Sequence, residues 1–528
     1  MHARSIVFAA LSIPAALAAS GALADVTISS AVTQNMACSN GVCAPTASDA
    51  VLNVGDLENL LAAGSVEVTT TGSGVQANGI RVDTPLNWSS VNTLALNAYR
   101  GIAVAKPVNV TGAGGVTLTT NDGGTGGMLL FNERGHISFA NLASPLTING
   151  ASYTLENSIA SLANAINTNP GGAYALAGDY NAHQDGTYSE PPVMGEFTGS
   201  FEGLGNTISH LKIRALGKRG AALFSTILPV GSVAGLILSK VDYHTSGGVN
   251  HPISSGGIVA ENEGTITNSH VDGNISGSNG KNGDTGGLAG DNSGTISDSS
   301  ANVQIVTSAS AGGLIGDNAG TILRSSAGGR IVCGGKTGNC IFAGGLVAQN
   351  EGVGSVALVS QSFATTAVTG NGARYGAMLG GLVGEMFAGD ESTAAVINSY
   401  STGSVSGNIV YEHYAVGVGG LIGEFLSGTG KNTVERSYAT GAVSGQNGAV
   451  AGGFACQIFP YNAKLDYWDT TTSGTDHGEC GGSAAGVTGL TTTQLQAGLP
   501  TGFNPKVWKE DPNINNGFPY LINNPPAK

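Results

Sequence analysis

The amino-acid sequence predicts an all-β fold, a right-handed parallel β-helix (solenoid) with short capping helices. Glycine accounts for 84 of the 528 residues, whereas charged residues make up 11% and aromatic residues 6%. Valine, isoleucine and leucine are spread among glycine, serine, threonine and asparagine, which is typical of short strands joined by tight turns. A glycine-rich pattern also returns at intervals of 26 to 39 residues, and a period of that size indicates a solenoid.

Each copy of the pattern begins with two glycines followed by apolar residues. Most copies continue with two further short apolar segments, so one repeat is expected to supply three strands of a single coil. Stacked coils would place leucine, valine and isoleucine in inward columns. The paired glycines are expected to permit corner angles that a Cβ forbids. They are Gly256 and Gly257, Gly286 and Gly287, Gly312 and Gly313, Gly344 and Gly345, Gly380 and Gly381, and Gly419 and Gly420, with a worn copy at Gly452 and Gly453.

Four segments are predicted along the chain. They are a signal peptide over residues 1–24, an N-terminal solenoid region over 25–195, the repeat β-helix over 196–485, and a cap on its C-terminal end over 486–528. Two short helices interrupt the N-terminal region. One is expected to be capped by Asp56 and to end near Gly64, and the other to run from about Leu155 to Ile166.

The first residues have the features of an export signal. An apolar run from Ile6 to Ala19 precedes Ala22-Leu23-Ala24, a small-x-small cleavage pattern, so the mature chain is expected to begin at Asp25. No later segment is apolar enough to cross a bilayer. The sequence therefore predicts a protein that is secreted or displayed on the outer cell surface, with the periplasm as the alternative.

The six cysteines fall into neighbouring pairs, and an even number of cysteines behind a signal peptide favours disulfide bonds. None has the Cys-x-x-Cys spacing of a metal site. The disulfide candidates are Cys38 with Cys43, Cys333 with Cys340, and Cys456 with Cys480, the third being the least local.

Charge restricts the partners. The formal net charge is −14, and no basic stripe is visible along the sequence. A protein of this kind is poorly suited to bind nucleic acid through its phosphates or to dock on anionic lipid. The expected partner is instead a polysaccharide or a surface protein.

Three motifs recur together in the later copies: Gly380–Gly384, then Asn398-Ser399-Tyr400, then Thr402–Gly407. In this combination the region resembles the GLUG repeat of bacterial surface proteins. Residues 197–208 and 466–470 are similar to the lead-in and the ending of such repeats. Residues 25–195 and 491–521 resemble filamentous-haemagglutinin-like exoproteins. The resemblance implies a β-helical adhesin, and it is specific for architecture rather than for activity.

Motifs that would carry chemistry are few. Gly335-Lys336-Thr337 ends like a phosphate loop, but Arg330 stands where the first glycine is required. Residues 511–515 begin like a calcium loop, but Ile522 stands where glutamate is needed. We therefore assign no catalytic residue, no metal ligand and no cofactor.

Two groups of residues keep alternative interpretations. Residues near the end of the repeats could hold a metal or act as paired carboxylates, or they could form a solvated turn, which we favour: Asp466, Asp469, Asp476, His477 and Glu479. Tyr400, Tyr414 and Tyr438 could form a platform for a sugar, but packing between coils is the favoured interpretation.

Three classes of function fit the sequence. The first is a non-catalytic adhesin, with insertions near residues 388–393 and 408–414 as candidate contacts. The second is a structural matrix or surface-layer protein with no specific ligand. The third is a carbohydrate-active β-helix enzyme, a lyase or hydrolase, which needs carboxylates or calcium-assisted basic residues along one groove. The repeats show columns of glycine, serine and threonine instead, so no enzyme activity is expected, and the long repetitive face together with the resemblance favours the first class.

Overall fold

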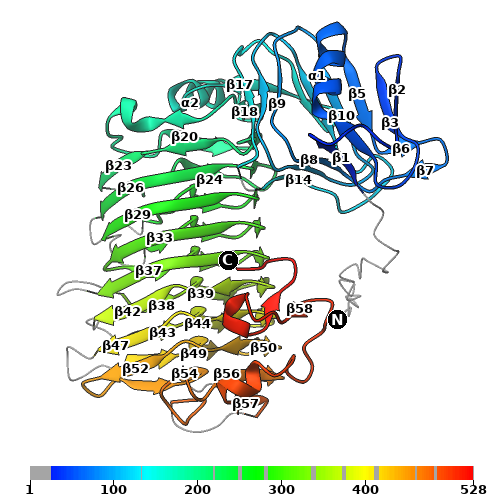
Figure 1. Cartoon of the computed structure of the whole chain (residues 1–528). Helices are drawn as coiled ribbons and strands as arrows, with labels where there is room; N and C mark the ends of the chain where they lie inside the picture. The colour runs from blue at the N-terminus through cyan, green and yellow to red at the C-terminus, as the bar shows by residue number, and fades with distance from the viewer. Residues whose placement is uncertain are drawn as a thin grey trace, which may run out of the picture. The chain divides into compact units, whose positions relative to one another are not determined.

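The structure, a computed structural model, describes residues 25–132, 134–217, 220–247, 253–278, 283–334, 340–371, 376–408, 416–457, 461–480 and 485–526. The predicted signal peptide lies outside these residues. The chain is a parallel β-helix, as predicted (Figure 1). It divides into two units. Unit 1 holds the residues up to Gly135 with Thr147–Gly150, and unit 2 holds His136–Leu146 and everything from Ala151 onward. Residues 151–195, grouped above with the N-terminal region, thus belong to unit 2.

Unit 1 is a short stack of parallel strands. Leu94 and Leu96 pair in register with Val116 and Leu118, and all four are buried because alternate residues of a strand face the core. One sheet contains β1 (Val26–Ser29), β4 (Val51–Asn53), β8 (Ile80–Val82), β11 (Ile102–Val104) and β14 (Leu129–Phe131), and a second contains β5 (Val66–Thr69), β10 (Leu94–Asn97) and β13 (Val116–Thr119). Strand β9 (Leu86–Trp88) pairs with β12 (Val108–Val110). Two hairpins are formed by β2 (Met36–Ser39) with β3 (Val42–Pro45) and by β6 (Thr71–Gly72) with β7 (Val75–Gln76).

One helix lies in unit 1, α1 (Val54–Ala63). The predicted cap at Asp56 is wrong. The side chain of Asn53 caps this helix instead, because its Oδ1 accepts from the backbone N–H groups of Gly55 and Asp56 at 2.9 and 3.2 Å. The carboxylate of Asp56 accepts a hydrogen bond from the Thr33 hydroxyl at 2.6 Å.

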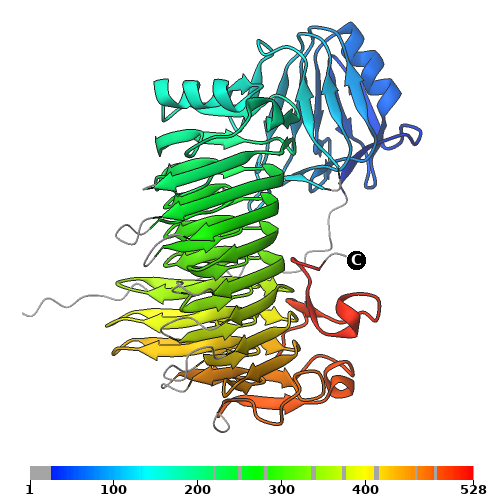
Figure 2. The same ribbon diagram turned by 90° about the vertical axis from the view of Figure 1, so that its left-hand side faces the viewer.

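Unit 2 is a stack of coils whose strands form four sheets (Figure 2). Sheet 1 contains β17 (Ala151–Glu156), β18 (Ala173–Leu176), β21 (Ser200–Glu202), β25 (Ser232–Ala234), β28 (Thr265–Thr267), β32 (Thr295–Ser297), β36 (Thr321–Leu323), β40 (Val356–Ser360), β45 (Thr393–Ile397), β50 (Lys431–Glu435) and β55 (Asn462–Lys464). Sheet 2 contains β19 (Tyr180–Asn181), β22 (Thr207–Ser209), β23 (Lys212–Gly217), β26 (Ile237–Gly247), β29 (His270–Ser278), β33 (Ser300–Thr307), β37 (Ser326–Gly334), β41 (Phe363–Ala364), β42 (Ala367–Asn371), β46 (Tyr400–Ser401), β47 (Val405–Asn408), β51 (Tyr438–Ala439), β52 (Val443–Gln446), β56 (Asp466–Asp469) and β57 (Val487–Leu490).

The other two sheets complete each coil. Sheet 3 contains β20 (Val193–Phe197), β24 (Phe224–Ile227), β27 (Val259–Asn262), β31 (Ala289–Asn292), β35 (Ile315–Asn318), β39 (Val347–Gly352), β44 (Val383–Ala388), β49 (Ile422–Ser427) and β54 (Ala455–Gln457). Sheet 4 contains β30 (Asp284–Gly286), β34 (Ser310–Gly312), β38 (Phe342–Gly344), β43 (Ala377–Gly380), β48 (Val416–Gly419) and β53 (Val450–Gly452).

Each repeat forms one coil. Ala289 pairs with Ile315, and Ile315 pairs with Val347, so the register advances by one repeat from coil to coil. The short strands of sheet 4 add a fourth segment to the three that the sequence pattern predicted. The leucines that follow the paired glycines are fully buried, as predicted: Leu288, Leu314, Leu346, Leu382 and Leu421.

The reason predicted for the paired glycines is wrong, because none of them has a positive φ. A Cβ on the first glycine of a pair would clash with the carbonyl oxygen three residues later in its own coil, as at Gly380, where that of Val383 would lie 1.8 Å away, and the second glycine is required by close approach of the next coil. A Cβ on Gly381 would lie 2.0 Å from the carbonyl oxygen of Gly420, and one on Gly287 would lie 2.1 Å from that of Gly313. The left-handed corner lies instead at the first position of the Asn-Ser-Tyr motif and at the equivalent position of the other coils, at Gly205, Gly235, Asn268, Asp298, Arg324, Gln361, Asn398, Arg436 and Leu465.

Buried serines and asparagines form two ladders along unit 2. The backbone N–H of each ladder serine except the last, Ser437, donates to the hydroxyl of the serine in the next coil, at 3.1 to 3.3 Å. The serines are Ser269, Ser299, Ser325, Ser362, Ser399 and Ser437. In the second ladder Asn262 donates to Asn292, Asn292 to Asn318, and Asn318 to Asn350, each at 2.7 Å. Because buried polar groups need partners, these ladders hold the coils in register.

The first coil of unit 2 is closed by α2 (Ile159–Thr168), whose residues Ile159, Leu162 and Ile166 enter the core. Ser158 caps this helix through its side chain, which accepts from the N–H of Ser161 at 3.0 Å. The helix begins later than predicted because residues 151–156 continue as β17.

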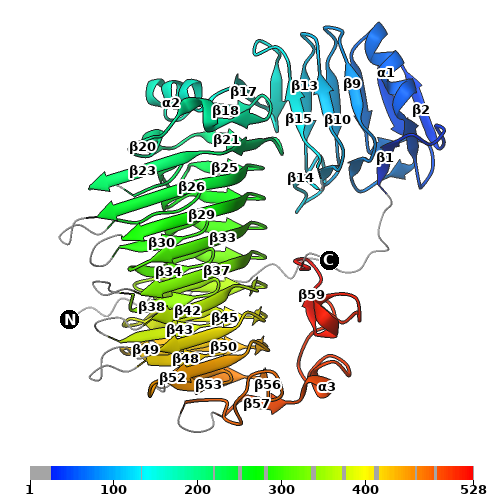
Figure 3. The same cartoon turned by 60° about the vertical axis from the view of Figure 1, so that its left-hand side comes forward.

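The C-terminal segment covers the last coil and then continues along the side of the stack. After β57 pairs with β56, residues 491–526 fold back along the outside of sheet 2 (Figure 3). We call residues 491–526 the tail. It includes α3 (Thr492–Leu495), β58 (Trp508–Lys509), η2 (Asn515–Gly517) and β59 (Tyr520–Leu521). Near its end, the side-chain amide of Asn524 donates to the carbonyls of Ser325 and Gln361 at 3.2 and 3.1 Å.

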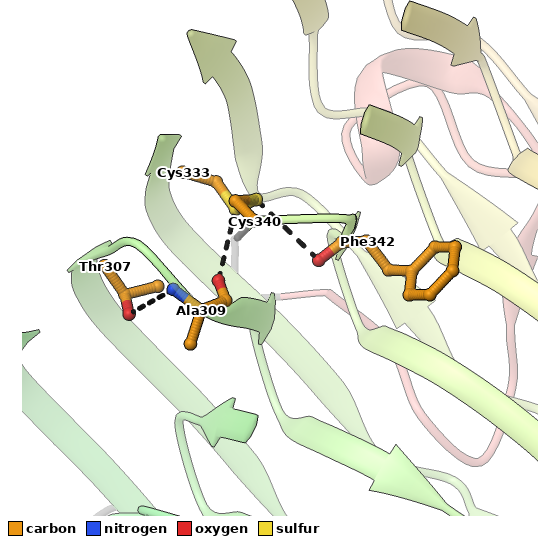
Figure 4. The surroundings of a disulfide bond; sticks show 5 residues. All are labelled: Thr307, Ala309, Cys333, Cys340 and Phe342. Atoms are coloured by element: carbon orange, nitrogen blue, oxygen red, sulfur yellow. Dashed lines mark hydrogen bonds between the residues drawn. A yellow bond between two sulfur atoms is a disulfide. The ribbon is translucent and has the colours of Figure 1, made fainter. Parts of the chain in front are cut away.

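All three predicted cysteine pairs form disulfides: Cys38 with Cys43, Cys333 with Cys340, and Cys456 with Cys480. The first joins facing residues of the β2–β3 hairpin. The second joins the end of β37 to the segment before β38, beside the carbonyl of Ala309 (Figure 4). Among the described helices, none is long and apolar enough to span a membrane.

Candidate functional site

The acidic cluster predicted near the end of the repeats does not converge on one point. The carboxylate of Asp466 ends the serine ladder by accepting from the N–H of Ser437 at 2.8 Å, and burial raises its pKa to about 7. The carboxylate of Asp469 accepts from the N–H of Thr471 at 2.8 Å and so organises a turn. The remaining members differ in exposure, since Glu479 is buried whereas Asp476 and His477 are largely exposed.

A metal role for this cluster finds no support in its geometry. Across the described residues, no three or more His, Cys, Asp or Glu side chains are grouped so that they could hold a metal ion. Glu479 accepts a hydrogen bond from the Tyr461 hydroxyl at 2.5 Å, which connects it to the last coils. The favoured interpretation of a solvated turn is nevertheless wrong for Asp466 and Asp469, because both side chains are fully buried and accept hydrogen bonds from backbone N–H groups.

The predicted tyrosines lie in a covered column. Tyr400 and Tyr438 stack with their ring centroids 5.0 Å apart and are fully buried beneath the tail, where the Trp508 ring lies against both. They pack between coils, as favoured above, and offer no platform for a sugar. Tyr414 lies outside the described residues.

The other sequence candidates also have local roles or fall outside the description. Gly335-Lys336-Thr337 lies outside it, as does most of the insertion at 408–414. The Asp511 carboxylate accepts from the N–H of Asn513 at 2.9 Å within a turn. In the insertion at 388–393, the Asp390 carboxylate accepts from the hydroxyl of Thr429 at 2.8 Å, so this insertion is bonded to the next coil.

A row of hydroxyl groups runs along the outer face of sheet 1. Its members occupy one register position in five successive coils and are partly exposed: Ser200, Ser232, Thr265, Thr295 and Thr321. We call these five residues the hydroxyl row. The residues that follow them point inward and are fully buried, as Val233 and Ile296 show. Strands in a sheet lie about 4.8 Å apart, so the row repeats its hydroxyl groups at that spacing.

Carboxylates form a second row, on sheet 3, which inspection of the sequence missed. Every copy of the repeat carries an acidic residue or glutamine five positions after its first glycine, and this regularity is the signal that could have revealed the row. The acid row comprises Glu261, Asp291, Asp317, Glu385 and Glu424, with Gln349 between Asp317 and Glu385.

Four carboxylates of the acid row, Asp291, Asp317, Glu385 and Glu424, have a raised pKa and therefore bind protons more tightly than ordinary carboxylates. Burial, with repulsion from Glu351 next, raises the pKa of Asp317 and of Glu385 to about 8. Burial raises the pKa of Asp291 to about 6, although the Ser254 hydroxyl, which donates to it at 2.6 Å, opposes the shift. Stacked carboxylates repel one another when ionised, so part of the row carries protons at neutral pH.

The third feature is a cavity of about 300 Å³ at the start of sheet 2, which we call the basic pocket. It is lined by His183, Gly186, Thr187, His210, Lys212, Lys240 and Asp242. His183 comes from the short helix η1 (Ala182–Asp185), and Lys212 and Asp242 face each other in neighbouring strands. His210 and Lys240 occupy the bends that precede these two positions, with φ of 59° and 53°.

Such left-handed angles are uncommon for residues other than glycine, although asparagine, aspartate and histidine adopt them more often than the rest. Here they bring a histidine and a lysine from two adjacent coils to one cavity. The signal in the sequence is the alternation His210-Leu211-Lys212-Ile213-Arg214, which places three basic residues on one face of a strand. The search for a long basic stripe missed it.

Comparison with known proteins adds little. No family model and no curated protein sequence matches the chain. Among solved structures, an IgA1 protease is 19% identical with a TM-score of 0.32, over 64% of this chain and 24% of its own length. A Bacteroides ovatus protein described as a "putative immunoglobulin A1 protease" is 16% identical with a TM-score of 0.32, over 71% of this chain and 93% of its own. The chain thus spans about a quarter of the first protein.

Proposed function

We propose that this chain is an exported adhesin that binds an extended polymer, a polysaccharide or the surface of another protein, without turning it over. The observation that carries the proposal is the hydroxyl row. Five coils repeat hydroxyl groups in register on one face, so a polymer lying along the stack would meet the same donor and acceptor groups at regular steps. Many weak contacts of this kind add up to useful affinity through avidity.

Two further features support an exported binding protein. Three disulfides are compatible with an oxidising location outside the cytoplasm. The agreement of one repeat with one coil is what a GLUG-type array would require, and we propose that relationship for residues 196–485. The candidate acids are held in separate structural roles, which favours binding over hydrolysis or lyase chemistry.

The proposal is tested by binding and turnover together. The mature chain, residues 25–528, is applied to arrays of polysaccharides and of surface proteins, and every polymer that it retains is then incubated with it and examined for shorter products. We expect retention of at least one polymer with its chain length unchanged. Release of shorter products would make the chain an enzyme, and retention of nothing would favour a structural matrix protein.

The hydroxyl row is tested by a triple variant, Thr265→Val, Thr295→Val and Thr321→Val. Valine keeps the shape and the strand preference of threonine and removes only the hydroxyl group. We expect retention to weaken about tenfold or more. A double variant on other faces, Thr226→Val on sheet 3 and Thr369→Val on sheet 2, is the control and should bind like the parent. Equal loss in both variants would contradict a role for the row.

A further inference from the structure

We propose that the basic pocket is the subsite at which this chain recognises a negatively charged sugar unit, so that its polymer is an acidic polysaccharide carrying sulfate or carboxylate groups. This inference rests on the proposed binding function and names the class of its ligand. It stands on a cavity, on the side chains that line the cavity, and on the scarcity of positive charge elsewhere.

The charge of the pocket is unusual for this protein. The whole chain has 21 lysine and arginine residues against 35 aspartate and glutamate residues. Two of those lysines and two of the nine histidines nevertheless line a single cavity of about 300 Å³. A cavity of this size lies at the lower end of the range for small-molecule sites, which suits one sugar ring with its charged group rather than a large ligand.

The carboxylate in the pocket wall is already neutralised. Asp242 accepts a hydrogen bond from the guanidinium of Arg214 at 2.6 Å, and the ammonium group of Lys212 lies 3.8 Å from the same oxygen. Arg214 also donates to the backbone carbonyl of Asp242 at 2.8 Å, which holds its side chain beside the pocket wall. With Asp242 paired in this way, Lys240 and part of the charge of Lys212 remain for an anion.

Other nearby carboxylates are occupied as well, since that of Asp272 accepts a hydrogen bond from the backbone N–H of Lys240 at 3.1 Å. Asp185, two residues after His183, accepts hydrogen bonds from the hydroxyl groups of Tyr180 and Tyr188. These two bonds hold the short helix that carries His183 against sheet 2. Gly186 and Thr187, which follow it, complete the rim without adding charge. The pocket is therefore a fixed frame with a net positive lining.

The form of the basic site argues against a nucleic acid. Phosphate backbones are bound by stripes of Lys and Arg that neutralise many phosphates, whereas this site is one cavity on a chain of net charge −14. An acidic polymer would be repelled by most of the surface and attracted at this place, because exposed like charges repel over about a Debye length. Attraction at one point would thus anchor the polymer at the pocket.

The test uses the mature chain with four immobilised probes: dextran sulfate, polygalacturonate, neutral dextran and single-stranded DNA. The pocket variant is Lys212→Gln with Lys240→Gln. The matched control is Lys431→Gln with Lys509→Gln, which removes the same charge from exposed positions elsewhere in unit 2. We expect the parent chain to bind dextran sulfate or polygalacturonate, the pocket variant to bind it about tenfold or more weakly, and the control to bind like the parent. Added salt should weaken the parent more than the pocket variant.

The outcomes separate this inference from the function on which it rests. Equal binding by the pocket variant and the parent, or equal loss in the control, overturns the pocket while leaving the adhesin in place. Binding of neutral dextran alone, or of DNA as tightly as of the acidic polysaccharides, also overturns it. If the parent binds no probe, the acidic-sugar assignment is wrong, and the wider arrays decide the adhesin itself. An unchanged melting temperature shows that the variants are folded, since both lysines are partly or fully exposed.

Discussion

One column of sheet 2 differs between the two ends of the stack in unit 2. His270, Ser300 and Ser326 occupy it in three coils, and Phe363, Tyr400, Tyr438 and Tyr467 occupy it in the next four. The first three are partly exposed, whereas the aromatic four are buried beneath the tail. We call the coils that contain residues 200–326 the open coils and those that contain residues 363–467 the covered coils. The same backbone repeat thus serves a polar surface at one end and an apolar contact at the other.

The comparison shows that the inward-facing and the outward-facing columns of side chains are constrained by different contacts. Leu288 in an open coil and Leu421 in a covered coil are both fully buried, because every coil must fill the same interior. The outer positions are free to vary with whatever lies over them. The hydroxyl row and the two lysines of the basic pocket belong to open coils, and the hydrogen bond of the tail to this end of the stack is that of Asn524 to the carbonyl of Ser325, in the last open coil.

The largest difference in stability between the open and the covered coils should appear when the indole ring that the tail packs on the covered coils is removed. Trp508 is 1% exposed and lies between the rings of Tyr400, Tyr438 and Phe503. We expect Trp508→Ala to lower the free energy of unfolding by about 3–5 kcal/mol, measured by chemical denaturation. Ser326→Ala, in the same column of an open coil, should change it by less than about 0.5 kcal/mol. Similar effects of the two substitutions would show that the tail adds no stability.

The next prediction concerns what the two ends share. Gly287→Ala in an open coil and Gly381→Ala in a covered coil each drive a Cβ against the carbonyl of the next coil, with no change in φ. Both should lower the free energy of unfolding by about 1–3 kcal/mol, as overpacking does. The melting temperatures of the two variants should fall together. A fall at only one site would mean that the coils are not packed alike at the two ends.

The acid row runs through both the open and the covered coils, and the raised pKa values of its carboxylates predict how stability depends on pH. The pKa of Asp317, in an open coil, and of Glu385, in a covered coil, is about 8, above the usual values near 4 of an unfolded chain. The folded state therefore binds more protons than the unfolded state between about pH 4 and pH 8, so this contribution to stability falls as the pH rises through that window.

Asp317→Asn and Glu385→Gln should each remove that penalty. We expect a gain on the order of 1–2 kcal/mol at pH 8 and little gain at pH 4, measured by denaturation at both pH values. The two variants should behave alike although they belong to different ends. A loss of stability at pH 8 would mean that the ionised carboxylates have partners that the structure does not show.

The smallest expected change in stability comes from hydroxyl groups in the aromatic column of the covered coils. The Tyr438 hydroxyl donates to the carbonyl of Pro519 at 2.5 Å and accepts from the Asn515 amide at 2.8 Å. The buried Tyr400 hydroxyl has no hydrogen-bond partner within the described residues. Tyr438→Phe should therefore destabilise by about 1 kcal/mol, whereas Tyr400→Phe should be neutral or stabilising. The reverse order, seen by thermal denaturation, would place the polar contacts of the tail elsewhere.

Much of the scaffold could be predicted from the sequence because the repeat length and the positions of its apolar residues determine the coil. The spacing of the paired glycines gave one coil per repeat, and the leucine after each pair identified an inward column. The reason for the glycines could not be deduced, because a Cβ clash with Gly420 at Gly381 depends on how closely two coils approach. The positive φ lies instead at Asn398 and at the equivalent residue of each other coil. In only some coils is that residue an asparagine or aspartate, whose short polar side chain tolerates a positive φ.

The outer features were harder to predict because they need the register. The acid row repeats at a fixed offset from the glycines, yet it becomes a row only when Asp291 is known to lie beside Asp317. The basic pocket needs more, since His183 and Lys240 belong to different coils and only the stacking of those coils brings the two residues to one cavity. Hydrogen bonds such as that of Asn524 to Ser325 link positions that no local pattern connects.

The central claim, that the open coils carry the binding surface, is tested most directly by lysine footprinting. The mature chain is acetylated with and without the acidic polysaccharide that it retains, and each lysine is quantified by mass spectrometry. The account predicts that Lys212 and Lys240 are protected by the polysaccharide, whereas Lys431 and Lys509, in a covered coil and in the tail, stay as reactive as in the free chain. Protection of Lys431 and Lys509 with no change at Lys212 and Lys240 would contradict it.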